Sequence, residues 1–190
     1  MATKAITMST GLLLLLLLVP AISASAPGNF IRTNCATTLD PAFCFSTLAR
    51  HVREIRGSPA NLARVAINIS FADARDVAAL ISKLSLKPND DPTNAALQDC
   101  TSAYGDAIDQ MKRSISEILN LNSNSKDFQL HISNVQTWMS AALTNQDTCA
   151  DGTEDMGDSV FSNRVVNGKK LTSIALAMIN KFAQSAQPKA

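Results

Sequence analysis

Few residues in this sequence have the types and spacing that chemistry requires. His51 and His131 fall in different predicted helices, and no Gly-x-Ser-x-Gly, Gly-x-Gly-x-x-Gly or phosphate-loop pattern occurs in the 190 residues. The acidic run from Asp147 to Asp158 has Cys149 at the third ligand position of a calcium loop and lacks the final glutamate. We therefore predict no catalytic residue, no metal site and no cofactor, and a protein that is not an enzyme.

One set of carboxylates follows a helical spacing. At about 100° per residue, Asp99, Asp106 and Asp109 fall on one side of a helix and an apolar arc falls on the other. This pattern has two interpretations, a solvated helix face or an acidic docking surface for another protein. In the second case, the carboxylates would set the orientation and the rate of association rather than catalyse a reaction.

The elements that must position these residues are helices. Four long helices are predicted at about 59–86, 92–120, 126–145 and 159–184, after a shorter helical segment at about 41–56. The helices at 59 and 92 each begin with a capping residue and a proline, Ser58-Pro59 and Asp91-Pro92. Short loops imply antiparallel neighbours, so we predict an all-α fold, an up-down-up-down four-helix bundle over residues 58–190. Tyr104 and Trp138 are predicted to be core residues.

The first 26 residues have the order of a secretory signal peptide. Lys4 precedes seven Leu and one Val at 12–19, and small residues follow at 21–26. This apolar run is far shorter than the roughly 20 residues of a membrane-spanning helix, and nothing later is apolar enough to span a bilayer. Removing Lys4 from the 17 basic residues leaves 16 against 16 acidic ones in the mature chain, 27–190. That balance argues against binding to nucleic acid.

Four cysteines lie in the mature chain, and a secreted protein keeps such cysteines as disulfides. Their number alone allows three pairings. In an antiparallel hairpin, the start of the 92–120 helix lies beside the end of the 126–145 helix. Cys100 and Cys149 are therefore expected to pair, which leaves Cys35 and Cys44 to close a small ring near the N-terminus.

Three segments resemble the plant invertase/pectin methylesterase inhibitor family. They are CATTLDPAFC from Cys35 to Cys44, Leu97-Gln98-Asp99-Cys100 followed by Tyr104 and Asp106-Ala107, and the run from Trp138 to Cys149. The resemblance covers essentially the whole mature chain. It implies a four-helix bundle with an N-terminal helical hairpin extension, residues 27–57, and disulfides that join the first cysteine to the second and the third to the fourth.

The resemblance also implies a function and a set of contact residues. It implies a secreted inhibitor that covers the pectin-binding cleft of plant pectin methylesterase in a roughly 1:1 complex, and so modulates the de-esterification of cell-wall pectin. The positions that match the family's contact pattern, with two adjacent candidates at the end, are Asp106, Asp109, Thr148, Asp151, Asn145 and Gln146. Where the family often has Glu two residues after the third cysteine, this chain has Ser102.

Two alternative functions remain open. Invertase inhibitors of the family often carry Pro-Lys-Phe before the fourth helix, whereas this chain reads Ser125-Lys126-Asp127-Phe128. An acid invertase of the cell wall or vacuole is therefore the alternative target. A secreted helical protein of another class, such as a lipid carrier or a small enzyme, is the second alternative. Since no esterase domain follows Ala190, a free inhibitor rather than a pro-enzyme is expected.

The location follows from the signal peptide. We expect an extracellular protein of the apoplast and cell wall, with the vacuole as the less expected address. The sequon Asn68-Ile69-Ser70 is a glycosylation site if Asn68 faces solvent.

Overall fold

The computed structural model describes residues 26–88, 90–121 and 125–186, so residues 1–25 of the expected signal peptide lie outside the described residues. The helices in chain order are α1 (Ala26–Cys35), α2 (Pro41–Leu48), a 3-10 turn (Ala49–His51), α3 (Val52–Ile55), α4 (Pro59–Ser85), α5 (Asp91–Leu119), α6 (Phe128–Gly152), a second 3-10 turn (Glu154–Met156) and α7 (Ser159–Ser185). No described residue belongs to a strand, and no helix of this part of the chain has the length and apolarity to cross a membrane.

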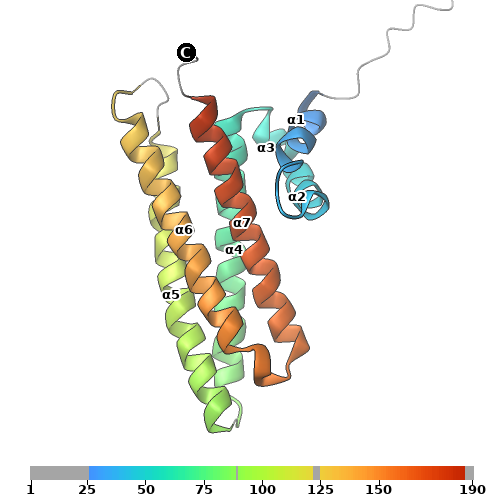
Figure 1. Cartoon of the computed structure of the whole chain (residues 1–190), viewed down its shortest axis with the longest axis vertical. Helices are drawn as coiled ribbons and strands as arrows, with labels where there is room; N and C mark the ends of the chain where they lie inside the picture. The colour runs from blue at the N-terminus through green and yellow to red at the C-terminus, as the bar shows by residue number, and fades with distance from the viewer. Residues whose placement is uncertain (1–25, 89, 122–124, 187–190) are drawn as a thin grey trace, which may run out of the picture.

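The four long helices form the predicted up-down-up-down bundle (Figure 1). α4 packs against α5 and α7, and α6 packs against the same two helices, so neighbours in sequence are neighbours in space. The two disulfides are Cys35–Cys44 and Cys100–Cys149, the pairs that the sequence favoured. The predicted all-α fold class is confirmed.

The long helices begin where side chains can accept from the free backbone N–H groups of the first turn. Ser58 accepts from the N–H of Asn61, and Asp158 does the same for the start of α7. The predicted cap of α5 is one residue too late, because Asp90 rather than Asp91 accepts from the N–H of Thr93, at 2.9 Å. Asp91 is the first residue of the helix, with Pro92 behind it.

The predicted end of α6 at residue 145 is wrong, since the helix continues to Gly152. The residues after 144 are largely polar, but Gln146 and Cys149 face the interior and are 0% and 1% exposed. Thr153 ends the helix: its buried hydroxyl donates to the carbonyl oxygen of Cys149 at 2.8 Å. Cys149 therefore lies within α6 rather than beyond it.

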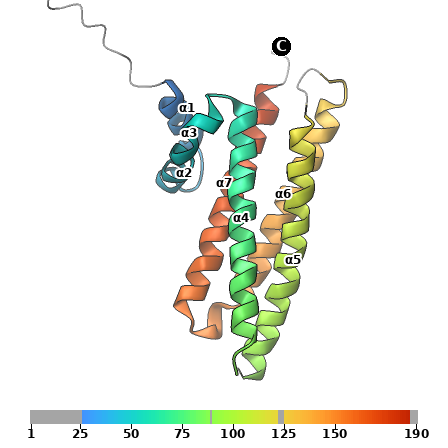
Figure 2. The same ribbon diagram turned by 180° about the vertical axis from the view of Figure 1, so that it is seen from behind.

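α1 and α2 of the N-terminal extension pack together as the helical hairpin that the resemblance implied, but residues 41–56 form α2, a 3-10 turn and α3 and not the single helix predicted there. The 3-10 turn at Ala49–His51 breaks that helix, and α1 precedes it. The bends allow Ile31, Leu48 and Ile55 to be buried together. The extension packs on α4, and Figures 1 and 2 show it on the α4–α7 side of the bundle.

Only one of the two aromatic residues predicted in the core is there. Tyr104 is fully buried, whereas Trp138 is half-buried and lies outside the core cluster. The buried face of α6 passes through Val135 and Met139. Trp138 is one residue from Met139, about 100° round the helix, which places it at the edge of that face.

A cluster of polar side chains lies inside the bundle, with one member from each long helix. Three of these side chains surround Gly168, which has no side chain of its own. A Cβ added at Gly168 would lie 2.7 Å from Asp73 Oδ2, 3.5 Å from the Tyr104 hydroxyl and 3.8 Å from Gln146 Nε2. Arg164 Nη1 lies 2.7 Å from Asp73 Oδ1. Burial raises the pKa of Asp73 against the opposing effect of Arg164, and burial likewise raises the pKa of Tyr104.

Asp73 should make the stability of the protein depend on pH. Its carboxyl binds a proton more tightly in the folded chain than in the unfolded chain, so its contribution to the free energy of unfolding increases as the pH falls from neutrality through the raised pKa. The gain stops below the ordinary value of 3.8. We expect wild type to gain stability relative to Asp73→Asn on acidification, by at most about 1.4 kcal/mol per pH unit.

Urea unfolding of both proteins at pH 7.0, 5.0 and 4.0 measures this difference, because the lowest pH lies close to the ordinary value of 3.8. The matched control is Asp99→Asn, which removes an exposed carboxylate from α5 instead. A stability difference between wild type and Asp73→Asn that stays constant or shrinks on acidification would contradict the assignment.

Candidate functional site

Each of the two histidines is paired with a glutamate, and the two do not lie together in one site. His51 Nδ1 lies 2.8 Å from Glu54 Oε1, and His131 Nδ1 lies 2.7 Å from Glu117 Oε1. Among the described residues, no group of three or more His, Cys, Asp or Glu side chains could hold a metal ion. The residues predicted to contact a partner are therefore the candidate site.

The face formed by α5 and α6 carries most of these residues. The Cys100–Cys149 disulfide and the bond from Asn145 Nδ2 to Gln110 Oε1, 3.1 Å long, fix the register of the two antiparallel helices. Asp106 lies between Cys100 and Gln110 in sequence, so it stands level with residues 145–149 of α6. Both Asp106 and Thr148 are exposed, and the structure brings them to the same seam.

The other carboxylates extend this surface. Asp99 and Asp109 are exposed on α5, and Asp151 is exposed near the end of α6. Asp109 Oδ1 lies 2.9 Å from the Nζ of Lys112. Because both side chains are exposed, this ion pair contributes little to the stability of the protein. We call Asp99, Asp106 and Asp109 the acidic surface. The prediction that they share an exposed helix face agrees with the structure.

One of the six predicted contact residues is wrongly assigned. Gln146 is fully buried and belongs to the cluster around Gly168, so it cannot meet a partner in this conformation. Asn145 next to it is half-buried and bonded to Gln110, which makes it a residue of the α5–α6 seam. Adjacent residues of a helix point about 100° apart, and this separates the two roles.

The same seam contains Glu117, a residue that no sequence pattern indicated. Glu117 Oε1 accepts from Asn134 Nδ2 at 3.1 Å and lies beside His131. The hydrogen bonds from His131 and Asn134 hold the pKa of Glu117 below its ordinary value. These residues are 14 and 17 positions from Glu117. No short-range spacing could therefore have linked them.

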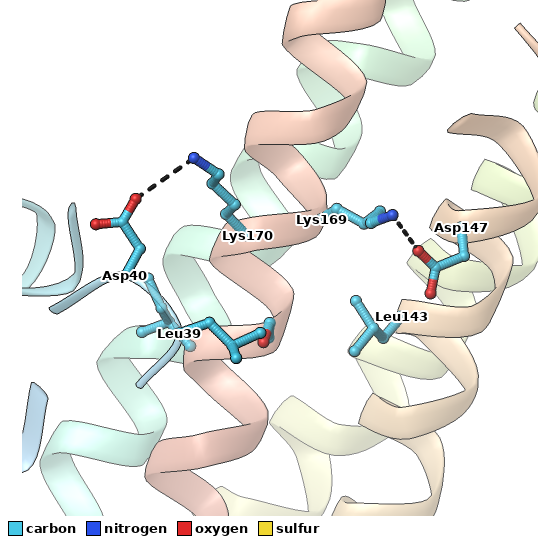
Figure 3. A pocket seen from close by; sticks show the side chains of 8 residues that line it. Leu39, Asp40, Leu143, Asp147, Lys169 and Lys170 are labelled. Atoms are coloured by element: carbon cyan, nitrogen blue, oxygen red, sulfur yellow. Dashed lines mark hydrogen bonds and ion pairs between the residues drawn. The ribbon is translucent and has the colours of Figure 1, made fainter. Parts of the chain in front are cut away.

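A hollow of about 220 Å³ lies beside the site, on the other flank of α6. Its apolar lining includes Leu143 of α6 and Leu39 from the loop between α1 and α2. Figure 3 shows the charged rim: Lys169 reaches Asp147 across the α6–α7 groove, and Lys170 reaches Asp40 of the extension. Three separate elements build this hollow, so the sequence could not indicate it.

Asn68, the predicted glycosylation site, is exposed on α4. It lines a shallow hollow with His51 and Glu54 of the extension. Its exposure meets the condition set by the sequence, and its modification stays a prediction.

Comparisons with known proteins give a consistent result over most of the chain. The model of a family described as plant invertase/pectin methylesterase inhibitor matches residues 29–178. A 21 kDa protein of Daucus carota is 36% identical, over 88% of this chain and 91% of its own length. Pectinesterase inhibitor 9 of Arabidopsis thaliana is 35% identical, over 84% of this chain and 83% of its own length.

The fold has a counterpart among solved structures. The crystal structure of mutant form A of a pectin methylesterase inhibitor from Arabidopsis superimposes with a TM-score of 0.67. The superposition covers 79% of this chain and 95% of the chain of the solved structure, at 23% sequence identity. At that identity the likeness shows a shared fold.

Proposed function

Because the chain belongs to the plant invertase/pectin methylesterase inhibitor family, we propose that it is a secreted inhibitor of plant pectin methylesterase in the cell wall. The family is one of protein inhibitors, not of enzymes. We further propose a roughly 1:1 complex in which the α5–α6 face covers the pectin-binding cleft of the esterase. Asp106, Asp109, Thr148, Asp151 and Asn145 are the proposed contacts.

The observation that carries this proposal is the continuous exposed face on two helices locked together by a disulfide. Asp106 and Thr148 stand at the same level, and the Cys100–Cys149 bond holds that level fixed. A surface that is already fixed loses little conformational entropy on binding. The exposed carboxylates suit a partner cleft with positive charge.

Acid invertase is the weaker candidate target. The residue that corresponds to the phenylalanine of the invertase-inhibitor motif is Phe128, and it is only 3% exposed. Its ring packs edge-on against Phe182, with 5.5 Å between the centroids. A side chain held in the core in this way is not presented to an active site.

A parallel titration tests the choice of target. The purified protein is titrated against a plant pectin methylesterase and against an acid invertase, and the residual activity of each is measured. We expect stoichiometric loss of esterase activity with invertase unaffected. Inhibition of invertase alone, or of neither enzyme, would overturn the proposal.

The acidic surface should control the rate of complex formation. Replacing Asp106 and Asp109 together by Asn should slow association with the esterase by about fivefold to tenfold at low salt, because two exposed charges that steer the encounter are lost. Added salt should reduce the difference from wild type. Surface plasmon resonance on immobilised esterase at 20 mM and 300 mM salt measures both effects.

The control for this prediction removes the same charge elsewhere. Asp76→Asn with Glu54→Gln changes two exposed acidic side chains on α4 and the extension, away from the α5–α6 face. If this pair slows association as much as the Asp106 and Asp109 pair, only the net charge matters and the proposed surface is wrong.

A further inference from the structure

A second charged site lies where the extension meets the bundle. Arg53 and Arg56 at the end of α3 and Arg64 in the second turn of α4 line one hollow of about 410 Å³, with Glu54 and Asn61 completing the wall. Arg53 and Arg56 are exposed, and Arg64 is half-buried. Three guanidinium groups therefore surround a single concave surface.

The backbone that presents these arginines is held by local bonds. Arg56 adopts a left-handed conformation, φ 51°, that ends α3, and its Nε donates to the carbonyl oxygen of Arg53 at 3.2 Å. Asn61 Nδ2 donates to the carbonyl oxygen of Ile55 at 3.5 Å, which ties the first turn of α4 to α3. The hollow is thus a fixed part of the junction between extension and bundle.

The three guanidinium groups have no acidic partner in the described part of the chain. No carboxylate of the described residues lies within 4.0 Å of them, whereas Arg164, Lys169 and Lys170 each have one. Glu54, which shares the hollow, is bound to His51. The hollow therefore presents positive charge that the fold does not use.

We propose that this hollow binds the carboxylates of de-esterified pectin, a polyuronate, and so anchors the inhibitor to the wall polymer. Guanidinium groups bind carboxylates in paired hydrogen bonds, and several such groups suit a chain that carries a carboxylate on each sugar. Glu54 and Asn61 can accept from sugar hydroxyls.

This anchoring leaves the esterase-binding face free. Figures 1 and 2 show the extension on the α4–α7 side, whereas the acidic surface lies on α5 across the bundle. The protein can therefore hold the polymer and the esterase at once, which raises the effective concentration of inhibitor where de-esterification has occurred. The choice of pectin as the polymer rests on the proposed function; the binding itself requires no esterase.

Binding to sodium polygalacturonate by the isolated full mature chain tests this inference, with affinity electrophoresis or calorimetry as the readout. A triple variant that carries Arg53→Gln, Arg56→Gln and Arg64→Gln should bind polygalacturonate at least about tenfold more weakly than wild type. The control Lys83→Gln, Lys87→Gln, Lys126→Gln removes equal charge at exposed sites elsewhere and should stay within about twofold of wild type. Because Arg64 is half-buried, the double variant Arg53→Gln, Arg56→Gln repeats the test at exposed positions only.

The outcomes separate the proposal from its competitors. Absence of binding, equal binding to fully methyl-esterified polygalacturonate, or equal loss in the arginine and lysine variants would overturn it. Binding to phosphatidylserine vesicles in preference to polygalacturonate would instead assign the hollow to a membrane. Inhibition of pectin methylesterase by the arginine variant on a small soluble substrate should match wild type, so failure of the anchor and failure of the proposed function are distinguishable.

Discussion

Replacing Cys100 and Cys149 together by Ala should lower the free energy of unfolding by about 4 kcal/mol. The bond joins residues 49 positions apart, so its loss returns much conformational entropy to the unfolded chain. Both cysteines are buried, so the variant also leaves small cavities in the core. Equilibrium unfolding in guanidinium chloride under non-reducing conditions measures the change.

The other disulfide is the matched control. Cys35 and Cys44 are only 9 positions apart, so replacing them by Ala should cost about 3 kcal/mol by the same argument. Function should separate the two variants further, because only Cys100–Cys149 fixes the register of α5 and α6. Weaker esterase binding by the Cys35/Cys44 variant than by the Cys100/Cys149 variant would contradict the role given to that register.

Gly168→Ala should destabilise the protein, although alanine favours a helix over glycine by about 0.5–1 kcal/mol. The added methyl would lie 2.7 Å from Asp73 Oδ2, and the Asp73 carboxylate is held on its other oxygen by Arg164. The carboxylate must move within a packed polar cluster, as in an overpacked core, which costs about 1–3 kcal/mol. Thermal or urea unfolding at neutral pH measures the net loss.

Gly105 provides the control for this prediction. It lies within α5, it is exposed, and a Cβ at this position would meet nothing within 4 Å. Gly105→Ala should therefore stabilise the protein by about 0.5–1 kcal/mol. If both substitutions shift stability in the same direction, the cluster around Gly168 does not determine the choice of glycine there.

Much of the fold was readable from local signals. Proline and capping residues marked the starts of α4 and α5 to within one residue, because the free N–H groups of a first helical turn require such side chains. Failures came where distant contacts overrode the local preference. α6 continues through its polar end because Gln146 and Cys149 are buried against other helices. The extension bends so that Leu48 and Ile55 are buried in the same core as the bundle residues.

The candidate site divides in the same way. Helical spacing placed Asp106 and Asp109 on an exposed face, because the opposite face of the same helix is apolar. The sequence could not tell which of two neighbouring residues is buried. Asn145 lies at the α5–α6 seam, whereas Gln146 lies in the core. Only the arrangement of four helices around the cluster at Gly168 decides between them.

The sequence by itself determined the helical class, the cysteines available for pairing, the exposed carboxylates of one helix and the membership of a family. The tertiary structure alone decided that Gln146 is buried, that Gly168 admits a carboxylate, and that Arg53, Arg56 and Arg64 share one hollow. The physical reason is that periodicity orders residues around one helix axis, whereas burial and charge clustering depend on how separate helices approach one another.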